Sequence, residues 1–218
     1  MTTSVHNFPT RLTKIDDLTR EDHSYLTEDD TCYYLGEYTA RAGYAFSYTN
    51  DLILNFKKSM DRREKPEWRY KEWAINAAAA AFHAALDDRA FARMTFVPVP
   101  PSKAKDHEMY DDRVFRMLLK IRPNPQLDVR ELLVQTQSTD AFHETDQRPS
   151  PEGLEALYEI DDSQASRQPI ESLAVVDDLL TTGAHFRAAE TVLSARFPGT
   201  EIIGLFIARR APDTSDPL

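Results

Sequence analysis

The chain of 218 residues contains a single cysteine, Cys32, and only six glycines. One cysteine excludes an intramolecular disulfide and any zinc site built from several cysteines. Cys32 lies in a strand-like segment, Thr31–Leu35, which favours a place in the core over a role as nucleophile. The sequence also lacks a run of about 20 apolar residues and an apolar leader near its N-terminus. We therefore expect a protein of the reducing cytoplasm without membrane contact.

Positive charge is scarce as well, because 26 basic residues face 36 acidic ones and the net charge is −10. Broad binding to nucleic acid or to an anionic membrane needs many cationic contacts, so this composition argues against both. One local exception is a basic cluster, for which a solvated helix end is the simpler interpretation. It comprises Lys57, Lys58, Arg62, Arg63 and Lys65.

Two glycine-rich phosphate motifs are also missing, Gly-x-x-x-x-Gly-Lys-Ser/Thr and Gly-x-Gly-x-x-Gly. What is present is a composition of 41% hydrophobic and 28% charged residues, which suits one globular core. Strand-like segments near residues 95, 130, 174 and 203 are separated by helical patterns. This alternation predicts an α/β fold with a doubly wound, mostly parallel sheet flanked by helices.

The predicted domain spans residues 31–210, with a small N-terminal extension or hood at 31–92 and a core at 93–210. Composition favours a flexible arm at 1–30 and a disordered tail at 211–218. The polar segment 138–150 is long for a connector and predicts a functional loop. Within it, His143 with Asp140 and Asp146 forms a possible metal cluster, although a solvated loop explains the same residues.

Local patterns predict the individual elements. Asn50 is the expected cap of a helix over 51–60, and Pro66 is expected to open a long helix over 67–92. The strand that includes Pro98 and Pro100 must end there or turn its missing N–H groups away from a neighbour. The remaining expected elements are strands at 31–39, 128–135 and 201–208 and helices at 19–25, 111–121, 151–158 and 184–197.

The most informative segment is 173–185. It holds an apolar strand, the adjacent acids Asp177 and Asp178, a Thr-Thr-Gly turn and the start of a helix. Backbone N–H groups at a helix N-terminus and nearby hydroxyls bind phosphate. Carboxylates accept hydrogen bonds from ribose hydroxyls or help to hold a cation. A second polar segment, 101–105, also follows a strand, so both are expected at the same sheet edge. Together they predict a site for a phosphorylated sugar.

The order Asp-Asp-x-x-Thr-Thr-Gly resembles the phosphoribosyl-pyrophosphate (PRPP) motif of type I phosphoribosyltransferases. That motif usually ends in Thr or Ser, where this chain has His185. The segment 97–103, Val-Pro-Val-Pro-Pro-Ser-Lys, is similar to the strand and pyrophosphate loop of the ComF-like branch. Segment 32–58 resembles the part that precedes the ComF-like core, and 137–148 resembles the mobile loop more weakly. The cysteine-rich zinc ribbon of many ComF-like proteins is not present in this chain.

The resemblance implies a type I phosphoribosyltransferase-like fold. It further implies that the chain binds PRPP with Mg²⁺ and transfers phosphoribosyl to an acceptor with release of pyrophosphate. Asp177 and Asp178 would be the catalytic pair at the ribose and possible magnesium contacts. The implied 5′-phosphate residues are Thr181, Thr182, Gly183, Ala184 and His185, and the implied pyrophosphate residues are Pro101, Ser102 and Lys103.

Alternatives stay open for several of these residues. The acid pair could be a polar strand end, and Lys103 could be an exposed loop lysine. Arg209 and Arg210 either line the acceptor site or end the last strand. A different function class also fits: a non-catalytic regulator that binds PRPP or a nucleoside 5′-monophosphate and acts in DNA uptake, defence or stress response. A homodimer is compatible with either function.

Overall fold

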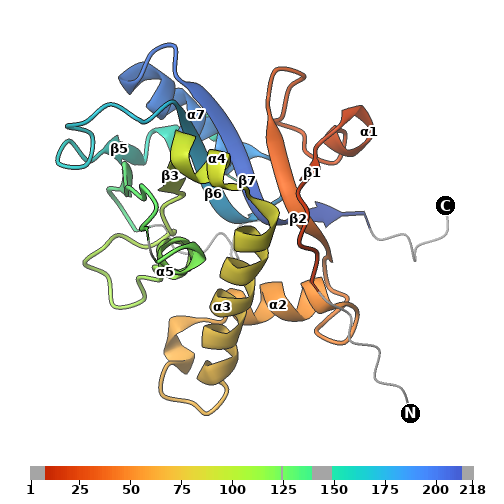
Figure 1. The fold of residues 1–218 in the computed structure, drawn as a ribbon. Coiled ribbons are helices and arrows are strands. Elements are labelled where there is room, and N and C mark those ends of the chain that lie inside the picture. Colours follow the sequence, from red (N-terminus) through yellow and green to blue (C-terminus); the bar gives the residue numbers. More distant parts are fainter. Residues whose placement is uncertain (1–7, 124, 139–148, 213–218) are drawn as a thin grey trace.

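The computed structural model describes residues 8–123, 125–138 and 149–212. Its centre is a mixed, mostly parallel sheet of five strands in the order β1-β2-β7-β6-β3, flanked by helices (Figure 1). Strands β2, β7, β6 and β3 are parallel, and β1 pairs antiparallel with β2. The bounds are β1 Thr13–Lys14, β2 Cys32–Thr39, β3 Met94–Pro98, β6 Ser172–Leu180 and β7 Glu201–Ala211.

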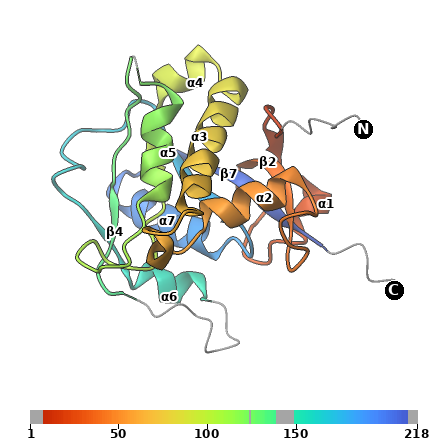
Figure 2. The ribbon, with the colours of Figure 1, turned by 90° about the horizontal axis from the view of Figure 1, so that it is seen from below.

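The alternation of side chains along β6 divides the core into two layers. Ala174 and Val176 pack with the helices α2, α3 and α5, whereas Leu173 and Val175 pack with α7. Figure 2 shows α2, α3 and α5 side by side on their face of the sheet. The helices are α2 Tyr48–Phe56, α3 Trp68–Ala85, α5 Arg113–Ile121 and α7 Ala184–Arg196. The α/β prediction is therefore confirmed at the level of layers and strand direction.

Residues 8–30, expected as part of a flexible arm, lie against the sheet instead. The short strand β1 extends its edge, and the short helix α1, Asp17–Arg20, is capped by the Asp16 side chain. Phe8, Ile15 and Leu26 are buried in the two core layers. Three scattered apolar anchors in a polar segment are enough to dock it, and composition alone does not reveal them.

The helices of the N-terminal half differ from the expected ones at their ends. Ser47, not Asn50, caps α2, and Asn50 lies inside the helix, where its amide pairs with the backbone of Thr39. A short 3-10 helix, η1 Met60–Arg62, follows α2. The long helix expected over 67–92 is two helices, because Leu86 is extended and Asp87 caps α4, Asp88–Arg93.

The C-terminal half also differs from the elements predicted from the sequence. The strand expected over 128–135 is divided. Val129 forms an isolated parallel bridge with Phe96 of β3. Residues Leu133–Gln135 form β4, which pairs antiparallel with β5, Tyr158–Ile160, in a separate small sheet. Helix α6, Pro151–Glu155, is correspondingly shorter than expected. Strand β3 ends at Pro98, as the prolines required. None of the helices in the described part of the chain is both long and apolar enough to cross a membrane.

Strand β7 continues through Arg209 and Arg210 to Ala211, so these arginines do not end it. The Arg209 guanidinium is largely buried and donates to the carboxylates of Glu37 (2.6 Å) and Asp22 (2.7 Å). It does not line the cavity described below. Pairing with β2 continues past it, to Thr39 opposite Ala211.

Candidate functional site

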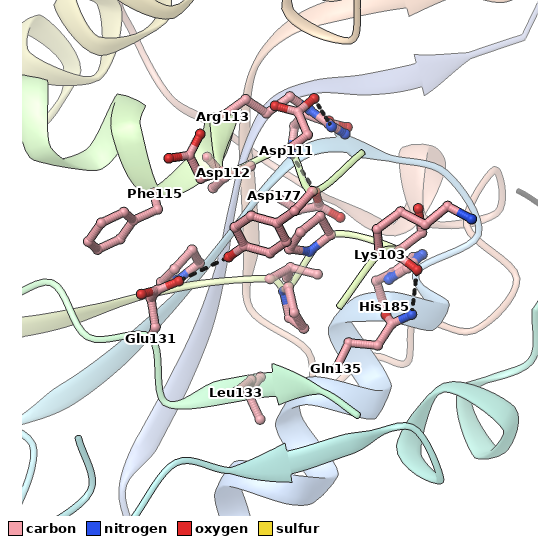
Figure 3. Close-up of a pocket in the computed structure, with 18 of the residues that line it drawn as sticks. Lys103, Asp111, Asp112, Arg113, Phe115, Glu131, Leu133, Gln135, Asp177 and His185 are labelled. Carbon is pink, nitrogen blue, oxygen red and sulfur yellow. Dashed lines mark hydrogen bonds and ion pairs between the residues drawn. The ribbon is translucent and has the colours of Figure 1, made fainter. Parts of the chain in front are cut away.

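A cavity of about 280 Å³ lies where β3 and β6 end and α7 begins. In Figure 3, Lys103 and His185 lie to the right of it, and Phe115 and Glu131 lie to the left. Of the residues predicted for the site, the cavity is lined by Asp177, Asp178, Thr181, His185, Pro101, Ser102 and Lys103. Thr182, Gly183 and Ala184 complete the turn behind this lining without belonging to it. The fold therefore brings the two predicted phosphate segments to one place.

Strand β6 does not stop before the acids but pairs with β7 as far as Leu180. Adjacent side chains on a strand point to opposite faces, so Asp177 and Asp178 have different surroundings. Asp178 is 2% exposed and lies on the face of α2 and α5. It accepts hydrogen bonds from Lys57 Nζ (2.9 Å) and from Arg113 Nη2 (2.6 Å) and Nε (2.9 Å).

These two cations outweigh the effect of burial and hold the pKa of Asp178 well below its usual range. Asp177 has no such partner among the described residues; its Oδ1 accepts the backbone N–H of Asp178 (2.7 Å). Burial, and next the charge of Asp178, raise the pKa of Asp177. One acid of the motif is thus a fixed, neutralised anion, and the other is the carboxyl group that a ligand in the cavity would meet.

The ion pair at Asp178 belongs to a longer chain of charges. Arg113 Nη1 donates to Asp111 (2.8 Å), and Asp111 accepts from Lys71 Nζ (2.8 Å). Lys71 is fully buried and also donates to the carbonyls of Phe56 (2.8 Å) and Lys58 (2.9 Å), at the end of α2. Burial lowers the pKa of Lys71, and Asp111 opposes that shift. The chain connects α3, α5, β6 and the end of α2.

The site predicted from the sequence did not include Lys71, Asp111 or Arg113. One signal existed, because Lys71 falls on the apolar stripe of α3, in helical register with Ala74, Ile75 and Ala78. A lysine at such a position needs a buried anion. Asp111 supplies it, although its Oδ1 has no hydrogen-bond partner in the part of the chain that the structure describes.

The Thr-Thr-Gly turn is shaped by glycine and held from behind by the N-terminal segment. Gly183 caps α7 with a φ of 87°, which only glycine adopts readily, and an added β-carbon would lie 2.8 Å from a methyl of Leu26. The backbone N–H of Tyr25 donates to the carbonyl of Thr182 (2.9 Å), and Nδ1 of His23 contacts the carbonyl of Thr181. These contacts orient the turn toward the cavity.

His185, which replaces the usual hydroxyl residue, is held by Tyr158 from β5. The Tyr158 hydroxyl lies 2.8 Å from His185 Nδ1. Burial, followed by the nearby charge of Asp177, raises the pKa of Tyr158, so the phenol stays protonated and can donate or accept a hydrogen bond. Burial, followed by Lys57, lowers the pKa of His185 to about 4. The ring is therefore neutral at pH 7. In the tautomer in which Nδ1 accepts from Tyr158, the proton lies on Nε2, which has no partner among the described residues and would be a donor for a ligand.

The loop after β3 is held by residues of β4 and its exit. Gln135 Nε2 donates to the carbonyl of Ser102 (2.7 Å), and Ser138 Oγ accepts from the backbone N–H of Ala104 (3.1 Å). Nearby, Lys105 forms an ion pair with Glu131 (3.0 Å). Gln135 was not foreseen as a site residue, because its partner is more than 30 positions away and its segment resembled an ordinary strand.

The described side chains around the cavity do not by themselves form a magnesium site. No group of three metal-ligating side chains occurs within residues 8–123, 125–138 and 149–212. Both carboxylate oxygens of Asp178 are engaged by Lys57 and Arg113, so only Asp177 of the motif's two acids is open to a metal ion. A magnesium ion here would need oxygens from a ligand. The alternative cluster of Asp140, His143 and Asp146 lies outside the described residues.

No model of a known protein family matches this chain, and no curated protein matches it. Its function must therefore be inferred from the residues and the geometry of the site.

Proposed function

We propose that this chain has a type I phosphoribosyltransferase-like fold, binds PRPP as its magnesium complex and transfers the phosphoribosyl group to an acceptor. The observation that carries the proposal is the meeting of two segments around one cavity. The turn at 181–185 offers a helix N-terminus and hydroxyls for a 5′-phosphate, and the loop at 101–103 offers Lys103 and Ser102 for pyrophosphate. Asp177 lines the same cavity and would accept hydrogen bonds from ribose hydroxyls.

In this reaction the bond from ribose C1 to the pyrophosphate oxygen breaks, and its electron pair leaves with pyrophosphate. A new bond forms from C1 to the nucleophilic atom of the acceptor, whose proton passes to solvent. The protein contributes positioning and charge stabilisation. Lys103 stabilises charge on the leaving pyrophosphate, and His185 Nε2–H together with the turn fixes the 5′-phosphate. Mg²⁺ comes with PRPP and adds positive charge at the leaving group.

A second candidate, a PRPP- or nucleotide-binding regulator without turnover, is favoured by one observation. Asp178 is fully engaged by Lys57 and Arg113, so only Asp177 of the pair is open to a sugar. Both candidates require a ligand with a 5′-phosphate at this site, whereas only the enzyme releases pyrophosphate from PRPP when an acceptor is added. A coupled pyrophosphate assay over a panel of nucleobases and other acceptors separates them.

Calorimetry with PRPP and with ribose 5-phosphate, both with Mg²⁺, tests the assignment of the two phosphate segments. Lys103→Met is expected to weaken the affinity for PRPP at least tenfold and to leave the affinity for ribose 5-phosphate unchanged, because only PRPP carries pyrophosphate. Thr181→Val is expected to weaken the affinity for both ligands. Lys14→Met, on the exposed edge strand, is the control and should change neither affinity. If the unmodified protein binds no PRPP, the proposal is refuted.

A further inference from the structure

A second, wider hollow of about 1030 Å³ adjoins the first cavity. It lies along α2, η1 and the start of α3, and we call it the α2–α3 groove. The side chain of Lys57 lines both the groove and the site cavity. Lys57 Nζ lies 2.9 Å from Asp178, so one lysine connects the groove with the acid pair.

Aromatic side chains are concentrated at this groove. Tyr44, Tyr70 and Trp73 line it, and Tyr44 and Tyr70 are 52% and 44% exposed. Large aromatic side chains left in contact with solvent provide flat surfaces on which a planar ring stacks. The site cavity itself has fewer such surfaces and lies just below the ~300–1,000 Å³ typical of small-molecule sites, so it has little room for an acceptor beside PRPP.

The groove is also locally basic. Residues 57–69 contain six basic and three acidic side chains, whereas the whole chain has a net charge of −10. Lys58 Nζ and the Arg69 guanidinium lie 5.3 Å and 4.9 Å from the ring centre of Tyr70. Neither cation forms an ion pair with a carboxylate of the described residues. Lys58 donates to Asn55 Oδ1 (2.8 Å) and to the backbone carbonyl of Glu67 (3.2 Å). Arg69 donates to the Tyr70 hydroxyl (3.0 Å).

The two carboxylates that line the groove have partners of their own. Glu67 lies 3.7 Å from Arg62, and Asp51 accepts a hydrogen bond from the Asn55 amide (2.9 Å). Lys58 and Arg69 are therefore the groove cations without an ion-pair partner among the described residues, while Asp51 keeps its negative charge at the Asn55 side of the groove. An aromatic surface with two such cations is complementary to a flat ring that carries an anionic group.

We propose that the α2–α3 groove is the acceptor site and that it takes a planar heteroaromatic ring with an anionic substituent. The inference rests on the proposed transferase function, because it places the acceptor next to PRPP through Lys57. The ring stacks on the aromatic wall with its anionic group at Lys58 and Arg69, and its nucleophilic edge faces the site cavity.

Two pairs of probes test the requirement for charge: orotate against uracil, and uridine 5′-monophosphate against uridine. Within each pair the ring is kept and the anionic group is removed, and the two pairs distinguish a carboxylate from a phosphate. The readout is the indole N–H signals of the protein in nitrogen-15 NMR spectra without PRPP. The chain has two tryptophans, and Trp68 lines a different hollow, so it is an internal reference for Trp73.

We expect at least one anionic probe to shift the Trp73 signal and leave the Trp68 signal in place, with an affinity at least tenfold higher than that of its neutral counterpart. Arg69→Gln and Lys58→Gln should each remove most of this difference. Arg89→Gln, which removes an exposed charge on α4, should preserve it. Equal binding of charged and neutral probes, no shift of Trp73, or unchanged binding in Arg69→Gln would overturn the proposal.

Calorimetry with PRPP on the same samples separates this inference from the proposed function. If PRPP binds and the groove binds none of the four probes, the acceptor assignment fails and the transferase proposal stands. If PRPP does not bind, the transferase proposal fails and the acceptor role fails with it. Pyrophosphate release with an anionic probe but not with its neutral counterpart would support both.

Discussion

The two acids of the motif, Asp177 and Asp178, are neighbours in sequence but lie in opposite surroundings. Asp178 faces a layer of helices and is neutralised by Lys57 and Arg113. Asp177 faces the cavity, where burial disfavours its charge. Two adjacent aspartates on a strand therefore need not share one role, because their side chains lie on opposite faces of the sheet. We infer that Asp178 holds the structure around the site, whereas Asp177 meets the ligand.

The largest expected effect is that of Asp178→Asn on stability. The amide leaves Lys57 and Arg113 without their buried anion, and breaking a buried ion pair from one side costs about 3–5 kcal/mol. Urea unfolding at pH 7.5 measures this loss. Asp162→Asn removes an exposed carboxylate and should stay within about 0.5 kcal/mol of the unmodified protein. A loss below about 1 kcal/mol for Asp178→Asn would mean that the ion pairs do not hold the site.

Gly183→Ala is expected to have the next largest effect. A β-carbon at positive φ costs about 1–2 kcal/mol, and here it also meets the Leu26 side chain at 2.8 Å. Unfolding free energy should fall by about 2 kcal/mol, and PRPP affinity should fall with it because the turn moves. Adding Leu26→Ala should restore the part of the PRPP affinity that the contact removed, although it creates a cavity of its own. No change in affinity in Gly183→Ala would show that the turn does not bind ligand.

The pH dependence of stability should distinguish Asp177 from Asp178. The pKa of Asp177 is raised above its ordinary value of 3.8, so its charged form destabilises the fold. The unmodified protein should therefore lose stability relative to Asp177→Asn as pH rises from about 4 toward neutral, by an amount on the order of 1–2 kcal/mol. The lowered pKa of Asp178 has the opposite sign: its contribution is present above about pH 4 and is lost in stronger acid. Unfolding curves between pH 4 and pH 8 that run parallel for the two proteins would contradict the assignment of Asp177.

Tyr158→Phe tests how the Tyr158 hydroxyl holds the His185 ring at the cavity wall. Without the phenol, His185 Nδ1 loses its donor, and the ring no longer has a fixed tautomer. We expect a loss of stability of about 0.5–1.5 kcal/mol and a several-fold weaker affinity for ribose 5-phosphate. Nitrogen-15 shifts of the His185 ring should show Nε2–H in the unmodified protein and a mixture in the variant. Tyr110→Phe, which removes a hydroxyl bonded to Glu131, should leave the ring signals unchanged. A doubly protonated ring at pH 7 in the unmodified protein would refute this account of His185.

The segment 173–185 could be predicted from sequence because its strand, turn and helix are determined locally. The apolar run, Gly183 and the helical pattern after it lie within a few residues of one another. The ion chain could not be predicted, because Lys71, Asp111 and Asp178 meet only after folding. Strand β5 was missed for a similar reason, since Tyr158 follows a good helix start at Pro151 and only pairing with β4 makes it a strand.

Whether Asp177 meets the ligand is measured by calorimetric titration of PRPP with Mg²⁺ into the unmodified protein and into Asp177→Asn, with unfolding measured on the same samples. We expect PRPP to bind the unmodified protein and to bind the variant at least tenfold more weakly. The variant should be as stable as the unmodified protein or more stable. Equal affinity in the two proteins, or no affinity in the unmodified protein, would contradict this account.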